Sequence, residues 1–245
     1  MDQVKTDQTK MNRTKLAQGI WAVVPVKQFD QAKKRLSPVL NADERRRLSR
    51  VMLADVLDAL SKVSGIDGVL VVTCEPDAME LARTFGAEVL QEMTSCGLCE
   101  AVAMAGRYLD SRGCAGMISI PGDVPLLNVE EIERIILSHG AAPAVTVIPA
   151  WDGGGTNALL CTPADVISLH FGENSFSAHK DAVRMAGLEP MVIPSLGLAL
   201  DLDVADDLPT FLERDAATRT ARYLNEIRVM ERFGKPLSAR HRRTG

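Results

Sequence analysis

Strand-sized apolar runs alternate with amphipathic helical segments along most of this sequence, and this alternation limits the fold more than any other feature. Residues 20–26 and 68–74 are apolar and rich in β-branched side chains, and residues 43–63 between them repeat apolar side chains at helical spacing. Parallel strands need a long connection, which is usually a helix. The pattern therefore predicts a layered α/β domain with a largely parallel sheet.

The full series of expected elements supports this class. We expect strands over residues 20–26, 68–74, 87–90, 115–120, 144–148, 156–161 and 191–194. We expect helices over residues 43–63, 76–85, 101–109, 129–139, 177–186, 204–214 and 216–233. No low-complexity linker or internal repeat interrupts the series, so the sequence predicts one domain over residues 19–234, with disordered tails at 1–18 and, of basic character, at 235–245.

The composition argues against several classes of protein. Lys and Arg number 28 against 32 Asp and Glu, which gives a net charge of −4, and aromatic residues make up 4%. Nucleic-acid binding usually needs a concentrated basic face or an aromatic stacking platform, so we expect no nucleic-acid partner. No apolar run approaches the roughly 20 residues of a membrane helix, and the polar start has no signal-peptide pattern. The five cysteines, an odd number, are best explained as reduced thiols, which favours a cytoplasmic protein without membrane contact.

Three cations follow the first expected strand. In open α/β sheets ligands bind at the carboxyl ends of the strands, so the loops after strands are where a site is expected. Lys27 ends the strand at 20–26, and Lys33 and Arg35 follow it. Three cations near one sheet edge suit a triphosphate, which Arg binds through paired hydrogen bonds and Lys as a point charge. The alternative interpretation is a solvated basic loop.

Three aspartates suggest a metal site. Asp123 follows the strand expected at 115–120, in a loop stiffened by prolines. Asp201 and Asp203 have the period-2 spacing that places both side chains on one face of an extended segment. Neighbouring carboxylates repel each other unless a cation lies between them, and magnesium prefers oxygen ligands. The alternatives are a turn-forming role for Asp123 and a helix cap at residue 204 for Asp203.

Two loops of small residues suit an anionic ligand. The glycines at 153–155 allow close approach of the backbone, and Thr156 adds a hydroxyl. Residues 171–176 form a second turn before a helix, whose N-terminal amides suit a phosphate or a carboxylate. The alternatives are a flexible glycine loop and a simple helix cap by Asn174 or Ser175.

Other chemical motifs are weak. Cys96 and Cys99 have the C-x-x-C spacing, but no second pair completes a zinc site, and a redox pair is the less favoured alternative. The four histidines show no ligand spacing; His179 could reach an anion from its helix, although we favour a surface position for it. The sequence has neither a P-loop nor the glycine fingerprint of a dinucleotide fold.

Five motifs, taken in order, resemble one known family. They are VPVK at 24–27 with AKKRL at 32–36, PGDVPLL at 121–127, DGGGTNA at 152–158, FG at 171–172 with SF at 175–176, and ALDLD at 199–203. Together they are similar to the 2-phospho-L-lactate guanylyltransferases of coenzyme F(420) biosynthesis and to their phosphoenolpyruvate- and 3-phosphoglycerate-using relatives, over roughly residues 21–212. The resemblance implies a nucleotidyltransferase fold like that of the nucleotide-diphospho-sugar transferases, a GT-A-like three-layer sandwich with a mostly parallel, mixed sheet of seven strands.

The resemblance also implies roles for individual residues. It assigns magnesium to Asp123, Asp201 and Asp203, the acceptor to Thr156, Gly172 and Ser175, and the nucleotide phosphates to Lys27, Lys33 and Arg35, with Asp123 and Lys27 also catalytic. The resemblance also places Cys99 beside the nucleotide, at a position where the family usually has Asn. A thiol cannot replace an amide that both donates and accepts hydrogen bonds, so this departure bears on the guanine preference.

The implied reaction transfers GMP from GTP to a small phosphorylated carboxylic acid and releases pyrophosphate. The acceptor phosphate is already an anion, so positioning and charge neutralisation suffice without a general base. The alternatives are a related nucleotidyltransferase with another acceptor or base, and a non-catalytic nucleotide-binding homologue. A homodimer is left open, because the apolar side of residues 216–233 suits either the core or a partner.

Overall fold

Seven strands form one sheet in the computed structural model, which describes residues 19–94, 96–214 and 216–233. The strands are β1 (Ile20–Val26), β2 (Gly68–Thr73), β3 (Glu88–Gln91), β4 (Gly116–Ser119), β5 (Ala144–Pro149), β6 (Thr156–Thr162) and β7 (Met191–Val192). Their order is β3-β2-β1-β4-β6-β5-β7. Neighbouring strands are parallel except for β6, which runs antiparallel to both β4 and β5. The expected mixed, mostly parallel sheet is confirmed.

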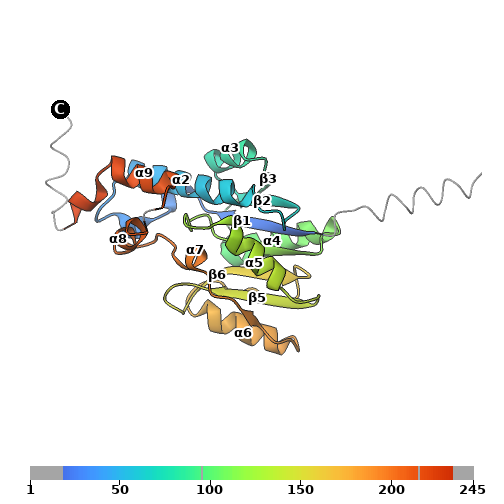
Figure 1. Cartoon of the computed structure of the whole chain (residues 1–245). Helices are drawn as coiled ribbons and strands as arrows, with labels where there is room; N and C mark the ends of the chain where they lie inside the picture. The colour runs from blue at the N-terminus through green and yellow to red at the C-terminus, as the bar shows by residue number, and fades with distance from the viewer. Residues whose placement is uncertain (1–18, 95, 215, 234–245) are drawn as a thin grey trace, which may run out of the picture.

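Helices cover both faces of this sheet (Figure 1). The α-helices are α2 (Ala42–Leu60), α3 (Pro76–Thr84), α4 (Leu98–Ser111), α5 (Val129–Ser138), α6 (Ser175–Met185), α7 (Leu196–Ala199), α8 (Asp207–Leu212) and α9 (Arg219–Glu226). On one face α2, α3 and α5 share a buried cluster with Val24 of β1. On the other face α4 packs against Val23 of β1, and α6 packs against β5 and β6. β1 is apolar on both sides because both of its faces are covered.

Local sequence explains where the first long helix begins. The side chain of Asn41 accepts a hydrogen bond from the backbone of Glu44, and the Glu44 side chain accepts one from the backbone of Asn41. This reciprocal pair satisfies two of the amides that a helix start leaves free. Asn128 caps α5 in a similar way through the backbone of Glu131.

A second apolar core lies beside α2 and orders the C-terminal part of the chain. It contains Leu48 of α2, Leu200, Leu202, Leu224 of α9 and Val229. Figure 1 shows α9 running beside α2. The apolar side of residues 216–233 therefore packs largely in the core of its own chain, while Met230 stays exposed.

The prediction of a single helix over residues 216–233 is wrong. α9 ends at Glu226, Arg228 adopts a left-handed φ of 49°, and a 3-10 helix η3 (Val229–Arg232) follows. In a continuous helix, two side chains five positions apart point in directions that differ by about 140° around the helix axis. The break allows Leu224 and Val229, which are five positions apart, to enter the same core.

Other boundaries differ less. The helix expected over 204–214 is shortened to α8, and that expected over 177–186 begins two residues earlier, at Ser175. The tails expected at 1–18 and 235–245 lie outside the described residues. Within the described part, no helix combines the length and the apolar character that crossing a membrane requires.

Candidate active site

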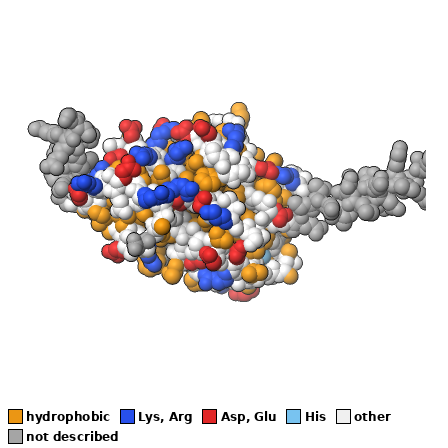
Figure 2. Space-filling model, turned by 45° about the horizontal axis from the view of Figure 1, so that its top comes forward, with side chains coloured by type: hydrophobic (Ala, Val, Ile, Leu, Met, Phe, Trp, Pro, Cys, Tyr) orange, Lys and Arg blue, Asp and Glu red, His pale blue; other side chains and the backbone are white. Residues whose placement is uncertain are grey.

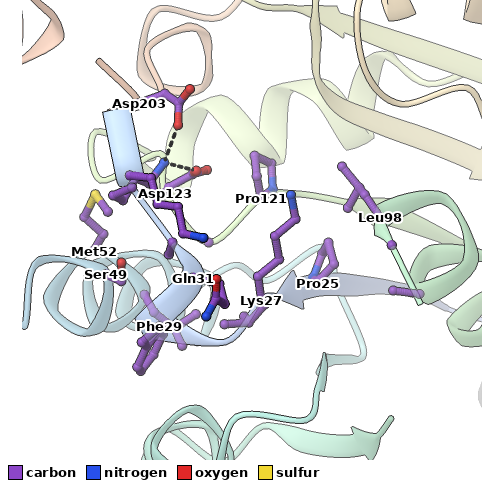
Figure 3. Close-up of a pocket in the computed structure, with 18 of the residues that line it drawn as sticks. Pro25, Lys27, Phe29, Gln31, Ser49, Met52, Leu98, Pro121, Asp123 and Asp203 are labelled. Atoms are coloured by element: carbon purple, nitrogen blue, oxygen red, sulfur yellow. Dashed lines mark hydrogen bonds and ion pairs between the residues drawn. The ribbon is translucent and has the colours of Figure 1, made fainter. Parts of the chain in front are cut away.

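A cavity of about 350 Å³ opens at the carboxyl ends of the parallel strands. Lys27 follows β1 and Asp123 follows β4, while Leu98 at the start of α4 lines the other end of the cavity. Figure 3 shows the Lys27 side chain extending between Asp123 and Leu98. The cavity is large enough for a small-molecule ligand, and it lies at the sheet edge where ligands bind in α/β folds.

Lys33 is the centre of the charged end of this cavity. It lies between two short 3-10 helices, η1 (Phe29–Gln31) and η2 (Lys34–Leu36), with a left-handed φ of 56°. Its side chain is 7% exposed, and its Nζ is 2.5 Å from Oδ2 of Asp123 and 3.6 Å from Oδ1 of Asp203. Dashed lines in Figure 3 mark these two ion pairs. A left-handed conformation costs free energy in a residue other than glycine, and such strain gathers at functional sites.

Burial and charge oppose each other at Lys33 and Asp201. Burial alone lowers the pKa of Lys33, but the carboxylates of Asp123, Asp203 and Asp201 raise it above its ordinary value. For Asp201, burial and the neighbouring Asp123 raise the pKa, while Lys33 and a hydrogen bond from Asn157 lower it in part. Lys33 therefore does not offset the effect of burial and of Asp123 on Asp201.

Arg35 and Lys27 are more open to solvent. Nη1 of Arg35 lies 3.1 Å from Oδ2 of Asp203, and the Arg35 side chain is 73% exposed. Lys27 is exposed and has no ion pair within the described part of the chain. Figure 2 shows Lys and Arg side chains gathered across the middle of one face of the molecule. The three predicted cations therefore all line one cavity.

The segment after α7 brings Asp201 and Asp203 to Lys33. Leu200 and Leu202 are buried in the second core, so the alternating aspartates face away from it. This segment forms no strand, but the period-2 spacing still places the Asp201 and Asp203 side chains on the same side, as expected. The backbone N–H of Leu202 donates to the carbonyl oxygen of Asp123 at 3.2 Å, which joins the two aspartate loops directly.

Asp203 does not cap a helix at residue 204. Instead, the side chain of Asp207 at the start of α8 accepts hydrogen bonds from the backbone N–H groups of Asp203 and Val204, at 2.8 and 2.7 Å. The capping alternative is therefore wrong, and the Asp203 carboxylate is available to Lys33 and Arg35. Among the described residues, no three acidic, His or Cys side chains already converge as a metal cluster; the ammonium of Lys33 lies between Asp123 and Asp203.

The predicted acceptor residues meet at the start of β6. The backbone N–H of Thr156 donates to Oγ of Ser175 at 2.9 Å, and the N–H of Ser175 donates to the carbonyl oxygen of Gly172 at 3.2 Å. Ser175 Oγ therefore accepts its hydrogen bond from the first residue of β6, not from the backbone of its own helix. Asn174 occupies the cap position of α6 without a side-chain bond, so the simple-cap alternative is wrong for both residues. None of these residues lines the 350 Å³ cavity.

Asn157 links this second region to the aspartates. Its Nδ2 donates to the carbonyl oxygens of Leu198 and Ala199, both at 2.9 Å, and to Oδ1 of Asp201 at 3.3 Å. Asn157 directly follows Thr156 in the sequence. The acceptor residues and the aspartates are therefore held by adjacent residues of one strand, β6.

Cys99 lies apart from the predicted nucleotide-binding residues. Its thiol accepts a hydrogen bond from the backbone N–H of Phe171 at 3.2 Å. The cavity is lined instead by its neighbours Gly97 and Leu98. Cys99 lines a neighbouring surface groove between α4 and residues 164–169, which shares Gly97 and Leu98 with the cavity. Cys99 itself does not line the cavity that holds Lys27, Lys33 and Arg35.

The expected surface position of His179 is also wrong. His179 is fully buried and bonds to the backbone of His170 and to the side chain of Thr156. Its turn of α6 packs inward against β5 and β6, which a helix-by-helix analysis of polarity cannot show.

Sequence reasoning missed several cavity residues. Glu92, which is 6% exposed, directly follows β3, so the rule that ligands bind at strand ends could have found it. Ser49 and Met52 come from the middle of α2, where no motif marks them. Ser49 is 7% exposed, and its Oγ is buried without a hydrogen-bond partner. A buried hydroxyl without a partner is costly, and here it lies at the cavity wall.

Residues 20–243 match the model of a family described as "Guanylyl transferase CofC like". The chain is 35% identical to the 2-phospho-L-lactate guanylyltransferase of Methanothermobacter thermautotrophicus, covering 84% of this chain and 90% of the relative. It is 33% identical to the phosphoenolpyruvate guanylyltransferase of Conexibacter woesei, covering 84% and 96%. It is 36% identical to the 3-phospho-D-glycerate guanylyltransferase of Colwellia psychrerythraea, covering 76% and 88%.

Solved structures agree on the fold. The chain superposes on a nucleotide-diphospho-sugar transferase of Desulfovibrio desulfuricans with a TM-score of 0.71 at 17% identity, covering 88% of this chain and 98% of that one. A cytidylyltransferase of Leptospira borgpetersenii gives a TM-score of 0.55 at 12% identity, covering 88% and 94%. The expected nucleotidyltransferase sandwich is confirmed. The family match over almost the whole described region, together with these relatives, shows that the chain belongs to the CofC-like guanylyl transferase family.

Proposed function

We propose that this protein transfers GMP from GTP to a small phosphorylated carboxylic acid and releases pyrophosphate, as a step of coenzyme F(420) biosynthesis in the cytoplasm. The acceptor class is that of its relatives: 2-phospho-L-lactate, phosphoenolpyruvate or 3-phospho-D-glycerate. The observation that carries the proposal is the cavity at the strand ends of a chain of this family, where Lys27, Lys33 and Arg35 lie with Asp123 and Asp203. Asp201 interacts electrostatically with this group through Asp123 and Lys33.

The nucleotide would lie in the 350 Å³ cavity. Lys27, Lys33 and Arg35 would contact its phosphates, and the unpartnered hydroxyl of Ser49 gives the ligand a hydrogen bond that the protein does not satisfy. The acceptor phosphate attacks the α-phosphorus of GTP, and pyrophosphate leaves. Because the nucleophile is already an anion, catalysis consists of alignment and neutralisation of charge.

The aspartates fit a magnesium ion. Three carboxylates offer the oxygen ligands that magnesium prefers. Burial and the neighbouring Asp123 raise the pKa of Asp201, and a cation bound beside it would favour its charged form. Asp123, Asp201 and Asp203 would hold the ion, which supplies neutralisation of phosphate charge when bound. Lys33 then becomes free to pair with the phosphates, because its present partners are Asp123 and Asp203.

The acceptor would lie at Thr156, Gly172 and Ser175. Gly172 has a left-handed φ of 130°, and a Cβ there would meet nothing within 4 Å. The open space suits a small ligand, and valine at this position would both strain the backbone and fill the space. We expect Gly172→Val to weaken acceptor binding and to leave GTP binding intact.

A panel of four nucleoside triphosphates against the three phosphoacids tests the function. With magnesium we expect pyrophosphate release and a GMP-linked product from GTP and one phosphoacid, at least about tenfold faster than with ATP, CTP or UTP. EDTA should stop the reaction. Product from a sugar phosphate or a pterin instead would indicate another nucleotidyltransferase. Magnesium-dependent GTP binding without turnover would indicate a non-catalytic homologue.

Asp123→Asn tests the metal assignment. We expect turnover to fall by about 100-fold or more, because one metal ligand is lost. The amide keeps an oxygen for Lys33, so the free energy of unfolding should fall by no more than about 1–3 kcal/mol. The matched control is Asp206→Asn, because Asp206 is exposed and its side chain makes no capping bond. A wild-type rate in Asp123→Asn would overturn the assignment, and global unfolding would make Asp123 a structural turn residue.

A further inference from the structure

One histidine joins three segments around the proposed acceptor residues. His179 of α6 is 0% exposed. Its Nε2 lies 3.0 Å from the backbone nitrogen of His170, and its Nδ1 lies 3.0 Å from Oγ1 of Thr156. The ring also meets the Phe171 ring edge-on, with centroids 4.9 Å apart. The imidazole therefore connects α6 with the start of β6 and with the loop before Gly172.

These contacts determine which ring nitrogen carries the proton. A backbone N–H only donates, so Nε2 of His179 accepts from His170 and carries no proton. In a neutral imidazole the proton then resides on Nδ1, which donates to Thr156 Oγ1. Burial, and to a smaller extent His170, lowers the pKa of His179 to about 4, which keeps the ring neutral at pH 7.

The bond from His179 sets the direction of the Thr156 hydroxyl. Oγ1 accepts from the ring, so its own proton points elsewhere, and no acceptor for it is present in the described part of the chain. Ser175 is in the same situation, because its Oγ accepts from the Thr156 N–H and its proton is left without an acceptor there. Both side chains are buried, at 8% and 2% exposure. Each hydroxyl therefore keeps a proton that the described residues do not use, and such a donor is what an anionic ligand requires.

We propose that His179 is a positioning residue for the acceptor, whose Nδ1–H holds the Thr156 hydroxyl as a hydrogen-bond donor toward the phosphate or carboxylate of the phosphoacid. The inference rests on the proposed function and adds a residue to it. Without the ring proton, the Thr156 hydroxyl can turn its own proton inward and present lone pairs to the anion. Acceptor affinity then falls, whereas binding of the nucleotide, proposed for the 350 Å³ cavity that His179 does not line, is unaffected.

A matched pair of variants separates the two bonds of His179. His179→Asn places an amide N–H near the position of Nδ1, so it keeps the donor to Thr156 and loses the acceptor for His170. His179→Gln keeps an acceptor near the position of Nε2 and loses the donor to Thr156. Each variant loses the ring and one hydrogen bond, so their structural costs are similar. Thermal unfolding of both variants serves as the folding control.

The readout is the KM for whichever of the three phosphoacids the wild type uses best. We expect His179→Gln to raise this KM by about tenfold or more, with the KM for GTP within about twofold. His179→Asn should stay within about threefold for both substrates. Equal rises in acceptor KM for the two variants, or a matching rise in the KM for GTP, would overturn the proposal.

A double-variant cycle tests whether His179 acts through Thr156. Thr156→Val removes the hydroxyl, so adding His179→Gln to it should raise the acceptor KM no further. Multiplying effects would overturn the proposal. The ¹⁵N shifts of the wild-type ring, measured by NMR at pH 7, give a second readout, because we expect the Nδ1–H tautomer and an Nε2–H tautomer contradicts the geometry. This measurement decides the question if His179→Gln does not fold.

Failure of this inference is distinguishable from failure of the proposed function. A wild type that forms no GMP-linked product with any phosphoacid overturns the function, and the tautomer measurement then still tests the ring geometry. An active wild type whose variants show no split between the two KM values overturns the role of His179 alone.

Discussion

At the scale of single residues, the charged end of the cavity carries local costs in stability. Lys33 has a strained backbone and a buried ammonium, and its partners are carboxylates that also repel one another. Asp201 shows the imbalance, because burial and Asp123 raise its pKa. Natural proteins accept such local costs at functional sites.

Asp201→Asn should therefore stabilise the metal-free protein. A raised pKa means that the folded state disfavours the charged carboxylate, so its charge lowers the free energy of unfolding at every pH above its ordinary value of 3.8. The variant removes the charge and keeps an oxygen for Asn157. We expect a gain of about 0.5–1 kcal/mol in urea unfolding at pH 7 with EDTA present, together with a loss of magnesium-dependent turnover.

Asp206→Asn is the control for this change as well, since it makes the same substitution five residues away on an exposed side chain. It should alter neither stability nor turnover. A metal-free Asp201→Asn protein less stable than the wild type would show that the carboxylate is compensated after all.

At the scale of elements, the neutral ring of His179 fastens α6 to β6, and this contact should depend on pH. The folded pKa of about 4 lies below the ordinary 6.5, so the group contributes stability above pH 6.5, and this contribution is lost as the pH falls toward 4. Between pH 7 and 4.5 we expect the difference in unfolding free energy between wild type and His179→Asn to shrink by about 2–3 kcal/mol.

The comparison between the two proteins isolates this histidine. Burial also lowers the pKa of His139, but His139 is present in both proteins and cancels in the difference. Urea unfolding at several pH values measures the effect. A difference that stays constant from pH 7 to 4.5 would mean that His179 titrates alike in the folded and unfolded chains.

Elements were more predictable than their contacts. The strand at 20–26 has the expected bounds, and each expected strand is present within a few residues, because an apolar run covered on both faces is visible in the residues themselves. The direction of Cys99 toward Phe171 was not predictable, since it depends on how residues 164–171 pack against α4. The burial of His179 likewise depends on which side of α6 faces β5.

At the scale of the whole molecule, ligand binding should be visible as a shift of the entire unfolding transition. The 350 Å³ cavity draws its walls from β1, α2, α4 and the segment around Asp203, so a nucleotide bound there would connect distant parts of the chain. GTP at 100 times its Kd adds about 2.7 kcal/mol to the free energy of unfolding. For a chain of this size, we expect the Tm to rise by about 5–10 °C.

Magnesium should be required for this shift. Without it, the phosphates of GTP meet Asp123, Asp201 and Asp203 with only the lysines and Arg35 to offset their charge. We therefore expect the rise in Tm, measured by scanning fluorimetry, to fall to a small fraction with EDTA. ATP with magnesium serves as the control for base preference. An equal shift with and without EDTA would exclude a metal-dependent nucleotide site.

The sequence by itself determined the alternation of strands and helices, the strand-end positions of Lys27 and Asp123, and the outward side of Asp201 and Asp203. Each of these follows from local spacing, which acts between residues close in the chain. Only the tertiary structure decided that Lys33 lies between Asp123 and Asp203, that Ser49 faces the cavity without a partner, and that His179 bonds to Thr156. Those relations join segments up to 170 positions apart. They arise from how the layers pack, which no local pattern records.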